Sequence, residues 1–371
     1  MCYTGGISPI RGGGIASVIL NVVDETEDEI NYTLVTSFDE IDLHEALSIY
    51  DATVRIVSLR SWNNALLNSI MYALNAPTSG FDIVHFHNLP MGRSLIYALK
   101  LHFKGVGLVF SHHFRRESTK YFPFNHRSGA EYYRLSFNYL SKIWRRIIVN
   151  SKFMLRDLKR YGDCVSKAAV IPNGVNIEKI QKSQPISLAG DPSFLFIGHL
   201  QWHKGVDILL RAFNLLLKKK SFGKAHLHLV GSGRMKPHYK DFVRRKKISN
   251  RVHFWGSLPQ NLVFRLLKGC DIFVLPSRSE GSPIVLLEAM AAEKPIISTN
   301  VGGIPEILAH NRNALMIQPK ETELVRAMEY LMENEDLMRA FSKNNRKDIV
   351  PFSWRNVCEK YVNLYGSIVN L

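Results

Sequence analysis

The stretch CDIFVLPSRSEGSPIVLLEAM, Cys270–Met290, runs from a strand-like segment into a helix-like one. Its first residues form a short apolar run, typical of a strand buried on both faces of a parallel sheet. Gly281 then permits a close approach of the backbone, and Pro283 pre-sets the first turn of a helix. Glu280 and Glu288 stand on either side of this turn. Taken by itself, the stretch favours a surface loop and an amphipathic helix, whereas the rest of the chain favours a site for a polyhydroxylated, phosphorylated ligand.

Strand-like and helix-like segments alternate along the whole chain. Because such alternation forms parallel sheets covered by helices, we expect two doubly wound α/β domains, as the length of 371 residues also suggests. The polar segment 181–193 is the expected linker between domains 1–180 and 194–350. The expected strands are 32–38, 53–59, 82–87, 106–111, 146–150, 168–172, 193–198, 225–231, 251–256, 270–277, 295–300 and 313–319. The expected helices include 62–74, 93–103, 205–219, 261–270 and 323–342.

Composition limits the class of protein. The formal net charge is +16, which favours an anionic partner such as nucleic acid, an anionic membrane face or a phosphorylated substrate. The 4 cysteines lie far apart and form no C-x-x-C pair, so a disulfide framework or zinc site is not expected and a reducing cytoplasm fits. No apolar run reaches the ~18 residues of a spanning helix, and the start lacks the basic region of a signal peptide.

Ligands of open parallel sheets bind beyond the carboxyl ends of the strands, where helices begin. Several of these corners suit an anion. RGGGIASVIL places Gly13 and Gly14 ahead of a helix, whose free N–H groups attract phosphate. Lys204 begins another helix after a strand, although a solvated lysine is the more usual finding. In the second half, glycines follow strands at four corners, represented by Gly198, Gly231, Gly281 and Gly302. One such corner is weak evidence, but four together favour a phosphate site.

Together these motifs resemble the family 4 retaining glycosyltransferases, which have the GT-B fold. The second half carries FIGHLQWHKGVDILLRAF, LVGSGR, CDIFVLPSRSEGSPIVLLEAMA and VGGIPEIL, similar to the donor domain of that family. The first half carries DIVHFHN, VFSHH, NSKFMLRDLKRYG and VIPNGVN in the same order. FSWRNVCEKYVNLY resembles the closing helix, here 351–371, which returns to the first domain. The resemblance implies an α/β GT-B protein with two Rossmann-like domains, acceptor-side and donor-side, facing a cleft.

The resemblance also implies site residues. Glu288 would hold the ribose hydroxyls of a sugar nucleotide, and Glu280 the hydroxyls of the transferred sugar. Lys204 would neutralise the departing diphosphate, and His87 would lie near the anomeric carbon and the acceptor. Catalytic roles thus fall on His87, Lys204 and Glu280. The further donor-binding residues would be Gly13, Gly14, His113, Gly174, His199, Gly281, Ser282, Pro283 and Ile284. The remaining histidines His85, His112 and His203 are expected to be structural.

Three departures from the family pattern stand out. His199 replaces a usual arginine and, with an ordinary pKa of about 6.5, is mostly neutral at neutral pH, which weakens one phosphate contact or makes it pH-dependent. Glu293 replaces a usual helix-ending glycine, which affects local stability more than chemistry. Only MCYT precedes the glycine loop where the first strand belongs, so we expect an exposed strand edge, and its effect on activity stays open.

The resulting hypothesis is a retaining transferase that uses a UDP- or GDP-linked sugar and a glycan or lipid-linked acceptor in cell-envelope or surface-polysaccharide synthesis. No aspartate pair suited to a metal–diphosphate clamp stands out, so neither a metal nor another cofactor is expected. Three alternatives remain: a GT-B sugar-nucleotide epimerase, a degenerate nucleotide binder, and a basic nucleic-acid-binding protein. The last is disfavoured because lysines and arginines are spread among helices without a known nucleic-acid motif.

A second hypothesis concerns the membrane. EYYRLSFNYLSKIWRR, residues 131–146, places Tyr133, Phe137, Leu140 and Trp144 at helical spacing beside basic residues. This pattern is typical of an ordinary helix that buries the aromatic stripe. Alternatively, it forms a basic, aromatic face with 112–122 and 217–224 that docks on an anionic membrane, which predicts a cytoplasmic enzyme on the inner face.

Overall fold

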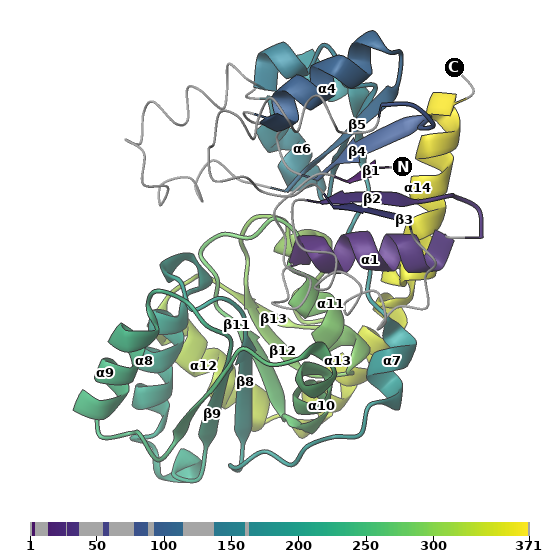
Figure 1. Ribbon diagram of the computed structural model, residues 1–371. Coiled ribbons are helices and arrows are strands. Elements are labelled where there is room, and N and C mark those ends of the chain that lie inside the picture. Colours follow the sequence, from purple (N-terminus) through teal and green to yellow (C-terminus); the bar gives the residue numbers. More distant parts are fainter. Residues whose placement is uncertain are drawn as a thin grey trace. The chain divides into compact units, whose positions relative to one another are not determined.

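A computed structural model describes residues 2–3, 14–26, 28–36, 55–58, 78–87, 93–113, 137–159 and 163–369 (Figure 1). The chain divides into two compact units. The first comprises Met1–Asn173 and Trp354–Leu371, and the second comprises Gly174–Ser353. Gly13, Tyr133 and the expected helix 62–74 lie outside the described residues.

The first unit contains two parallel sheets whose strands follow the doubly wound order. Its strands are β1 (Cys2–Tyr3), β2 (Thr33–Thr36), β3 (Arg55–Ser58), β4 (Ile83–Phe86), β5 (Gly107–His112), β6 (Arg146–Val149) and β7 (Ala168–Val170). Hydrogen bonds join β1-β2-β3 and β4-β5-β6-β7, and β1 also contacts β4, which gives the spatial order β3-β2-β1-β4-β5-β6-β7. The short start therefore supplies strand β1, which pairs with β2 and contacts β4, and the exposed edge expected there stays a prediction.

Helices α1 (Gly14–Thr26), α4 (Arg93–Phe103), α6 (Lys152–Leu158) and α14 (Trp354–Val369) belong to this unit. The closing helix is confirmed, because α14 packs against α1 and β4 (Figure 1). Its buried residues recur at helical spacing, as in Val357, Tyr361 and Leu364, so one face is apolar.

The core of the first unit explains the aromatic stripe. Phe137, Leu140 and Trp144 are all buried, and the Trp144 ring stacks on Phe110 with centroids 5.4 Å apart. The described part of the stripe is therefore buried in the core, as the first interpretation predicts, and the alternative in which these three side chains face a membrane is wrong. Among the described residues, no helix is long and apolar enough to cross a bilayer.

The second unit is a six-stranded parallel sheet of order β10-β9-β8-β11-β12-β13. Its strands are β8 (Ser193–Ile197), β9 (His226–Val230), β10 (Val252–Gly256), β11 (Ile272–Leu275), β12 (Ile296–Thr299) and β13 (Leu315–Ile317). Helices α8 (Val206–Leu216), α9 (Lys236–Arg245) and α12 (Glu321–Met332) cover one face; α7 (Ile177–Lys182), α10 (Gln260–Gly269), α11 (Ile284–Ala291) and α13 (Glu335–Asp348) lie on the other (Figure 1). The strand order reverses between β8 and β11, and such switch points bind ligands beyond the strand ends.

Two local expectations change. The single helix expected over 323–342 is wrong, because α12 and α13 are separated at Glu333–Asn334, where Asn334 leaves helical geometry at φ −126°. The expected linker 181–193 begins inside α7, and its coil is bonded to the second unit through Ile186 N–H to the Arg265 carbonyl at 3.1 Å. Which segment acts as a hinge stays a prediction.

Candidate active site

Two loops meet at the switch point of the second unit. The loop after β8 contains a 3-10 turn, Trp202–Lys204, and passes through Gly205 into α8. Gly205 has φ 69°, and a Cβ there would lie 1.9 Å from the Pro276 carbonyl oxygen in the loop after β11. Only glycine fits, because both the left-handed backbone and the close approach exclude a side chain. The loops are therefore packed tightly together.

Glu280 lies in the second of these loops and meets Lys204 from the first. Lys204 Nζ donates to Glu280 Oε1 at 2.7 Å, and Ser277 Oγ donates to the same oxygen at 2.6 Å. The Thr299 hydroxyl in turn donates to the Ser277 carbonyl at 2.5 Å. Glu280 is only 7% exposed, so this partly desolvated ion pair depends on well-aligned partners. The second carboxylate oxygen, Oε2, takes part in neither bond.

The glycine corner after β12 supports the backbone of Glu280. Gly303 N–H donates to the Glu280 carbonyl at 3.2 Å. A Cβ on Gly302, which has φ 61°, would lie 1.9 Å from that carbonyl oxygen. Similarly, a Cβ on Gly231 would lie 2.0 Å from the carbonyl oxygen of Gly198. Several glycines taken from the sequence as phosphate-binding corners thus serve close approach of one loop to another.

Glu288 has a different environment. It lies in α11, is 8% exposed, and accepts a long hydrogen bond of 3.4 Å from the Gln260 side-chain amide of α10. Burial raises the pKa of Glu288 to about 7, and the bond from Gln260 offsets only part of that effect. A buried carboxylate poised near neutrality is typical of functional sites. Sequence reasoning found Glu288 but missed Gln260, because 28 positions separate them and only the packing of two helices joins them.

The start of α11 is suited to an anion. The helix begins at Ile284 with Pro283 as its N-cap, one residue later than expected. The Leu286 amide donates to the Pro283 carbonyl, whereas the amides of Ile284 and Val285 point out of the first turn without an acceptor inside the helix. Gly281 and the Ile284 side of this turn are partly exposed, so a phosphate oxygen has access to these donors.

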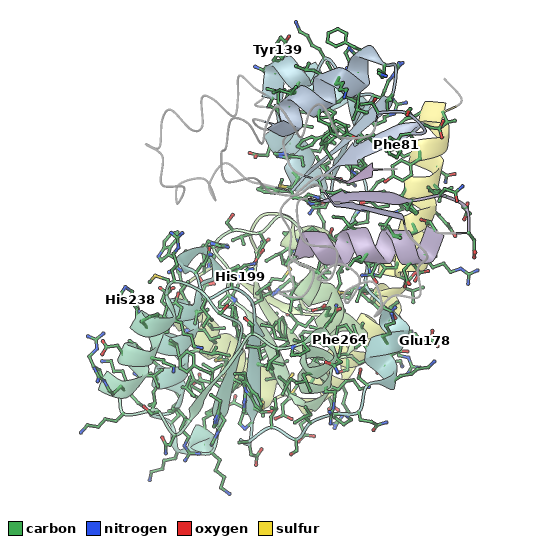
Figure 2. The ribbon with its side chains drawn as sticks, in the orientation of Figure 1. Phe81, Tyr139, Glu178, His199, His238 and Phe264 are labelled. Atoms are coloured by element: carbon green, nitrogen blue, oxygen red, sulfur yellow. The ribbon has the colours of Figure 1, made fainter. Side chains whose placement is uncertain are left out.

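The remaining residues assigned to the second unit are placed as follows. His199 is exposed in the loop that follows β8 (Figure 2). Gly174 is buried ahead of α7, and Ser282 is half-buried beside Pro283. His203 is half-buried, and its carbonyl accepts a hydrogen bond from the Arg278 amide at 2.7 Å. Of the residues assigned to this unit from the sequence, Lys204 and Glu280 are joined by a direct hydrogen bond.

In the first unit, His85 on β4 is held as a structural residue. Its Nδ1 bonds to the Tyr365 hydroxyl of α14 at 2.8 Å, and its Nε2 to the Ser111 hydroxyl of β5 at 2.7 Å. Its ring stacks on His87 with centroids 4.0 Å apart. Burial, with a smaller contribution from the charge of His113, lowers the pKa of His85 well below its ordinary value. The closing helix thus helps to fix the end of β4.

His87 and His113 lie together at the carboxyl ends of β4 and β5. His87 Nδ1 and His113 Nε2 are 3.3 Å apart, and the rings are nearly parallel at 12°. Burial holds the pKa of His87 well below its usual range and lowers that of His113 to about 4. His112 packs against Phe137, and burial lowers its pKa to about 3. All of these imidazoles are neutral at physiological pH.

Gly14 is the first residue of α1, as the glycine loop predicts. Among the residues that the structure describes, no group of three or more His, Cys, Asp or Glu side chains is arranged to hold a metal ion.

Comparison with known families now adds to this geometry. Residues 12–179 match Glycosyltransferase Family 4, and residues 177–348 match Glycosyl transferases group 1. Together with the two parallel α/β units, these matches define a glycosyltransferase of GT-B fold. The chain belongs to the group 1, family 4 glycosyltransferases, and it is an enzyme that transfers sugar from a nucleotide sugar.

Individual relatives are distant. An uncharacterised glycosyltransferase of Methanocaldococcus jannaschii is 28% identical over 346 residues, 92% of this chain and 91% of that protein. The N,N'-diacetylbacillosaminyl-diphospho-undecaprenol alpha-1,3-N-acetylgalactosaminyltransferase of Campylobacter jejuni is 28% identical over 64% of this chain and 63% of its own length. Two other curated relatives are matched over only 54% and 57% of their lengths. The crystal structure of Anabaena HepE with UDP-glucose has the same fold, with a TM-score of 0.80 over 100% of this chain and 99% of that chain at 16% identity.

Proposed function

We propose that the protein is a retaining hexosyltransferase that moves a sugar from a UDP- or GDP-linked donor to a glycan or lipid-linked acceptor in surface-polysaccharide synthesis. The observation that carries this proposal is the pairing of Glu280 with Lys204 at the switch point, with Glu288 in the helix that follows. The resemblance to HepE, which binds UDP-glucose, and to the C. jejuni enzyme, whose name specifies a diphospho-undecaprenol acceptor, supports it.

Glu288 is the residue that we assign to the ribose. A carboxylate that is buried and has only a neutral amide donor gains most from new hydroxyl donors. A diol would supply two such bonds and would favour the ionised form, so nucleotide binding would release a proton from the fraction of Glu288 that is protonated. The ribose hydroxyls thus supply hydrogen bonds that the Glu288 carboxylate would receive from water if it were exposed.

Lys204 and Glu280 act on opposite parts of the donor in this proposal. The lysine has three N–H donors, one of which goes to Glu280, so it can also donate to the diphosphate. The free amides at the start of α11 would bind another phosphate oxygen. Glu280 retains Oε2 for the hydroxyls of the sugar. Negative charge on the diphosphate grows as the glycosidic bond breaks, so these donors stabilise the transition state more than the ground state.

Neither glutamate acts as a nucleophile. Lys204 and Ser277 hold the Glu280 carboxylate by hydrogen bonds, and backbone contacts support its loop. A carboxylate held in this way suits binding rather than nucleophilic attack. We infer that the departing diphosphate accepts the proton of the acceptor hydroxyl on the same face of the sugar, which retains the anomeric configuration. His87, kept neutral by burial, is assigned to hydrogen-bond the sugar, and His113 to orient His87. Gly13, Gly14, Gly174, His199, Ser282 and Pro283 are assigned to donor binding as well.

A ligand panel tests this proposal. Thermal shift with UDP- and GDP-linked sugars should show stabilisation by one nucleotide series, since a ligand at 100 times its Kd adds about 2.7 kcal/mol. Incubation of that donor with lipid-linked or free glycans should give a product whose new linkage keeps the donor's anomeric configuration in NMR spectra. Stabilisation by no sugar nucleotide, or a product with inverted configuration, contradicts the proposal. Donor turnover to an epimer without an acceptor would identify an epimerase instead.

A further inference from the structure

Arg278 ties the two switch-point loops together. It lies in the loop after β11, two positions before Glu280. Its guanidinium forms a two-pronged ion pair with Asp207 in the first turn of α8, with Nη1–Oδ1 and Nη2–Oδ2 distances of 2.7 Å each. Nη1 also donates to the Trp202 carbonyl at 2.7 Å. The Arg278 side chain thus binds the loop after β8 on both sides of Lys204.

Two more contacts come from the same residue. The Arg278 amide donates to the His203 carbonyl at 2.7 Å, and the guanidinium lies over the Trp202 ring, 4.3 Å from its centroid. The Arg278 and Asp207 side chains are 21% and 20% exposed, so water screens this pair only in part. Tyr239 of α9 is buried within electrostatic range of the pair, and its hydroxyl forms no hydrogen bond with either residue.

The arrangement matters because Lys204 and Glu280 come from different loops. Residues Trp202 and His203 precede Lys204 and Asp207 follows it, and all three are held by Arg278. The bond between Lys204 Nζ and Glu280 Oε1 then needs only these two side chains to be ordered, because both backbones are already fixed. A misplacement of about 1 Å in such a constellation is enough to slow catalysis strongly.

We propose that Arg278 is a positioning residue that holds the loop of Lys204 against the loop of Glu280 and thereby sets the rate of sugar transfer. This inference rests on the proposed role of the Lys204–Glu280 pair in donor turnover. The shape of the guanidinium carries the function rather than its charge alone, because only a planar fork binds Asp207 through two bonds while donating to a carbonyl and stacking on a ring.

The test compares Arg278→Lys with Arg211→Lys. Arg211 approaches the same Asp207 at 3.8 Å, but it lies on α8, is 57% exposed and contributes no second bond. Both variants keep their charge. We expect Arg278→Lys to lower kcat for the donor about tenfold or more, with nucleotide diphosphate affinity changed less than about threefold, and Arg211→Lys to leave both unchanged. Equal behaviour of the two variants overturns the proposal.

A double-mutant cycle separates positioning from loss of stability. If Arg278 acts through the pair, Glu280→Gln should cost much less in the Arg278→Lys background than in the wild type, whereas independent losses would multiply and overturn the proposal. Hydrogen exchange of amides 199–206 should quicken in Arg278→Lys and stay unchanged in Arg211→Lys. Should Arg278→Lys not fold, Asp207→Asn replaces it in the same cycle with the same expected and contrary results. A wild type that turns over no sugar nucleotide would refute the proposed function, while the exchange measurement still tests the tie between the loops.

Discussion

The carboxyl ends of the strands hold opposite kinds of chemistry in the two units. In the second unit, a lysine and a glutamate form an ion pair between loops, and a second glutamate is buried beside a neutral amide. In the first unit, four histidines lie at the ends of β4 and β5, and burial keeps them neutral. One topology thus presents charge in one place and uncharged imidazoles in another. The difference is local: close packing of two loops gives Glu280 its partner, packing of α10 against α11 gives Glu288 its amide, and burial desolvates the histidines.

Removing Lys204 should have the largest effect, because it destroys the ion pair of the second unit. Lys204→Ala leaves Glu280 buried with Ser277 alone, so we expect kcat/KM for the donor to fall roughly 10²–10³-fold. Steady-state kinetics measure the loss. The double variant Lys204→Ala/Glu280→Gln should recover thermal stability but not activity, because it removes the unpaired charge. A Lys204→Ala enzyme with near-normal kcat/KM would show that the ion pair is only structural.

Glu288→Gln should stabilise the ligand-free protein against unfolding while weakening nucleotide binding. Because burial raises the folded-state pKa of Glu288 to about 7, the ionised form is disfavoured on folding, and this cost is fully present above that pKa and disappears below the ordinary value of about 4.5. At about pH 8 the variant should therefore gain roughly 2–3 kcal/mol in the free energy of unfolding. Denaturant titrations measure the gain. The exposed Glu333→Gln is the control, and an equal effect in both variants would contradict the assigned cause.

The histidine side of the comparison predicts sensitivity to acid. His112 has a pKa of about 3 in the folded protein, so only the unfolded chain takes up its proton below about pH 6.5, and stability falls as the pH drops. When the pH falls from neutral to about 5, the free energy of unfolding of His112→Gln should decrease by about 2 kcal/mol less than that of the wild type. The exposed His238 of α9, labelled in Figure 2, supplies the control His238→Gln. The idea fails if both variants follow the wild-type pH profile.

The smallest expected effect lies at the end of α11. Glu293 has φ 59°, and its amide and that of Lys294 donate to the Met290 and Ala289 carbonyls, which is a left-handed helix cap normally made by glycine. Glu293→Gly should raise the free energy of unfolding by about 1 kcal/mol without changing donor kinetics. Glu333, at the end of α12 with φ −78°, is the matched control, because glycine there should destabilise. Thermal unfolding of both variants would decide between strain relief and a general effect of glycine.

Much of the fold could be predicted from local sequence. The bounds of the strands from β2 to β13 lie within two residues of the expected bounds, because their continuous apolar, β-branched runs suit only buried parallel strands. The sequence does not predict the break between α12 and α13, because the apolar spacing continues through Asn334. Only the backbone angles of that residue leave helical geometry. The aromatic stripe of Phe137 and Trp144 likewise has the same spacing whether it faces a core or a membrane.

The candidate site could be predicted only as separate residues. Glu280 and Lys204 were identified from their motifs, but their bond spans 76 positions and depends on how tightly Gly205 lets the loops approach. Arg278 carries no signal of its own in the sequence, since its partner Asp207 is 71 positions away. Contacts between loops are set by tertiary packing, which spacing along one segment does not encode.

The central claim is that the two glutamates divide the donor between them, and calorimetry with the nucleotide diphosphate tests it most directly. Glu288→Gln should weaken binding by about tenfold or more, because it removes a charge-assisted contact to ribose. Glu280→Gln should leave the affinity within about threefold, or tighten it, since it releases Lys204 for the diphosphate, while transfer of the sugar is lost. Equal losses of nucleotide affinity in both variants, or none in Glu288→Gln, would contradict the division.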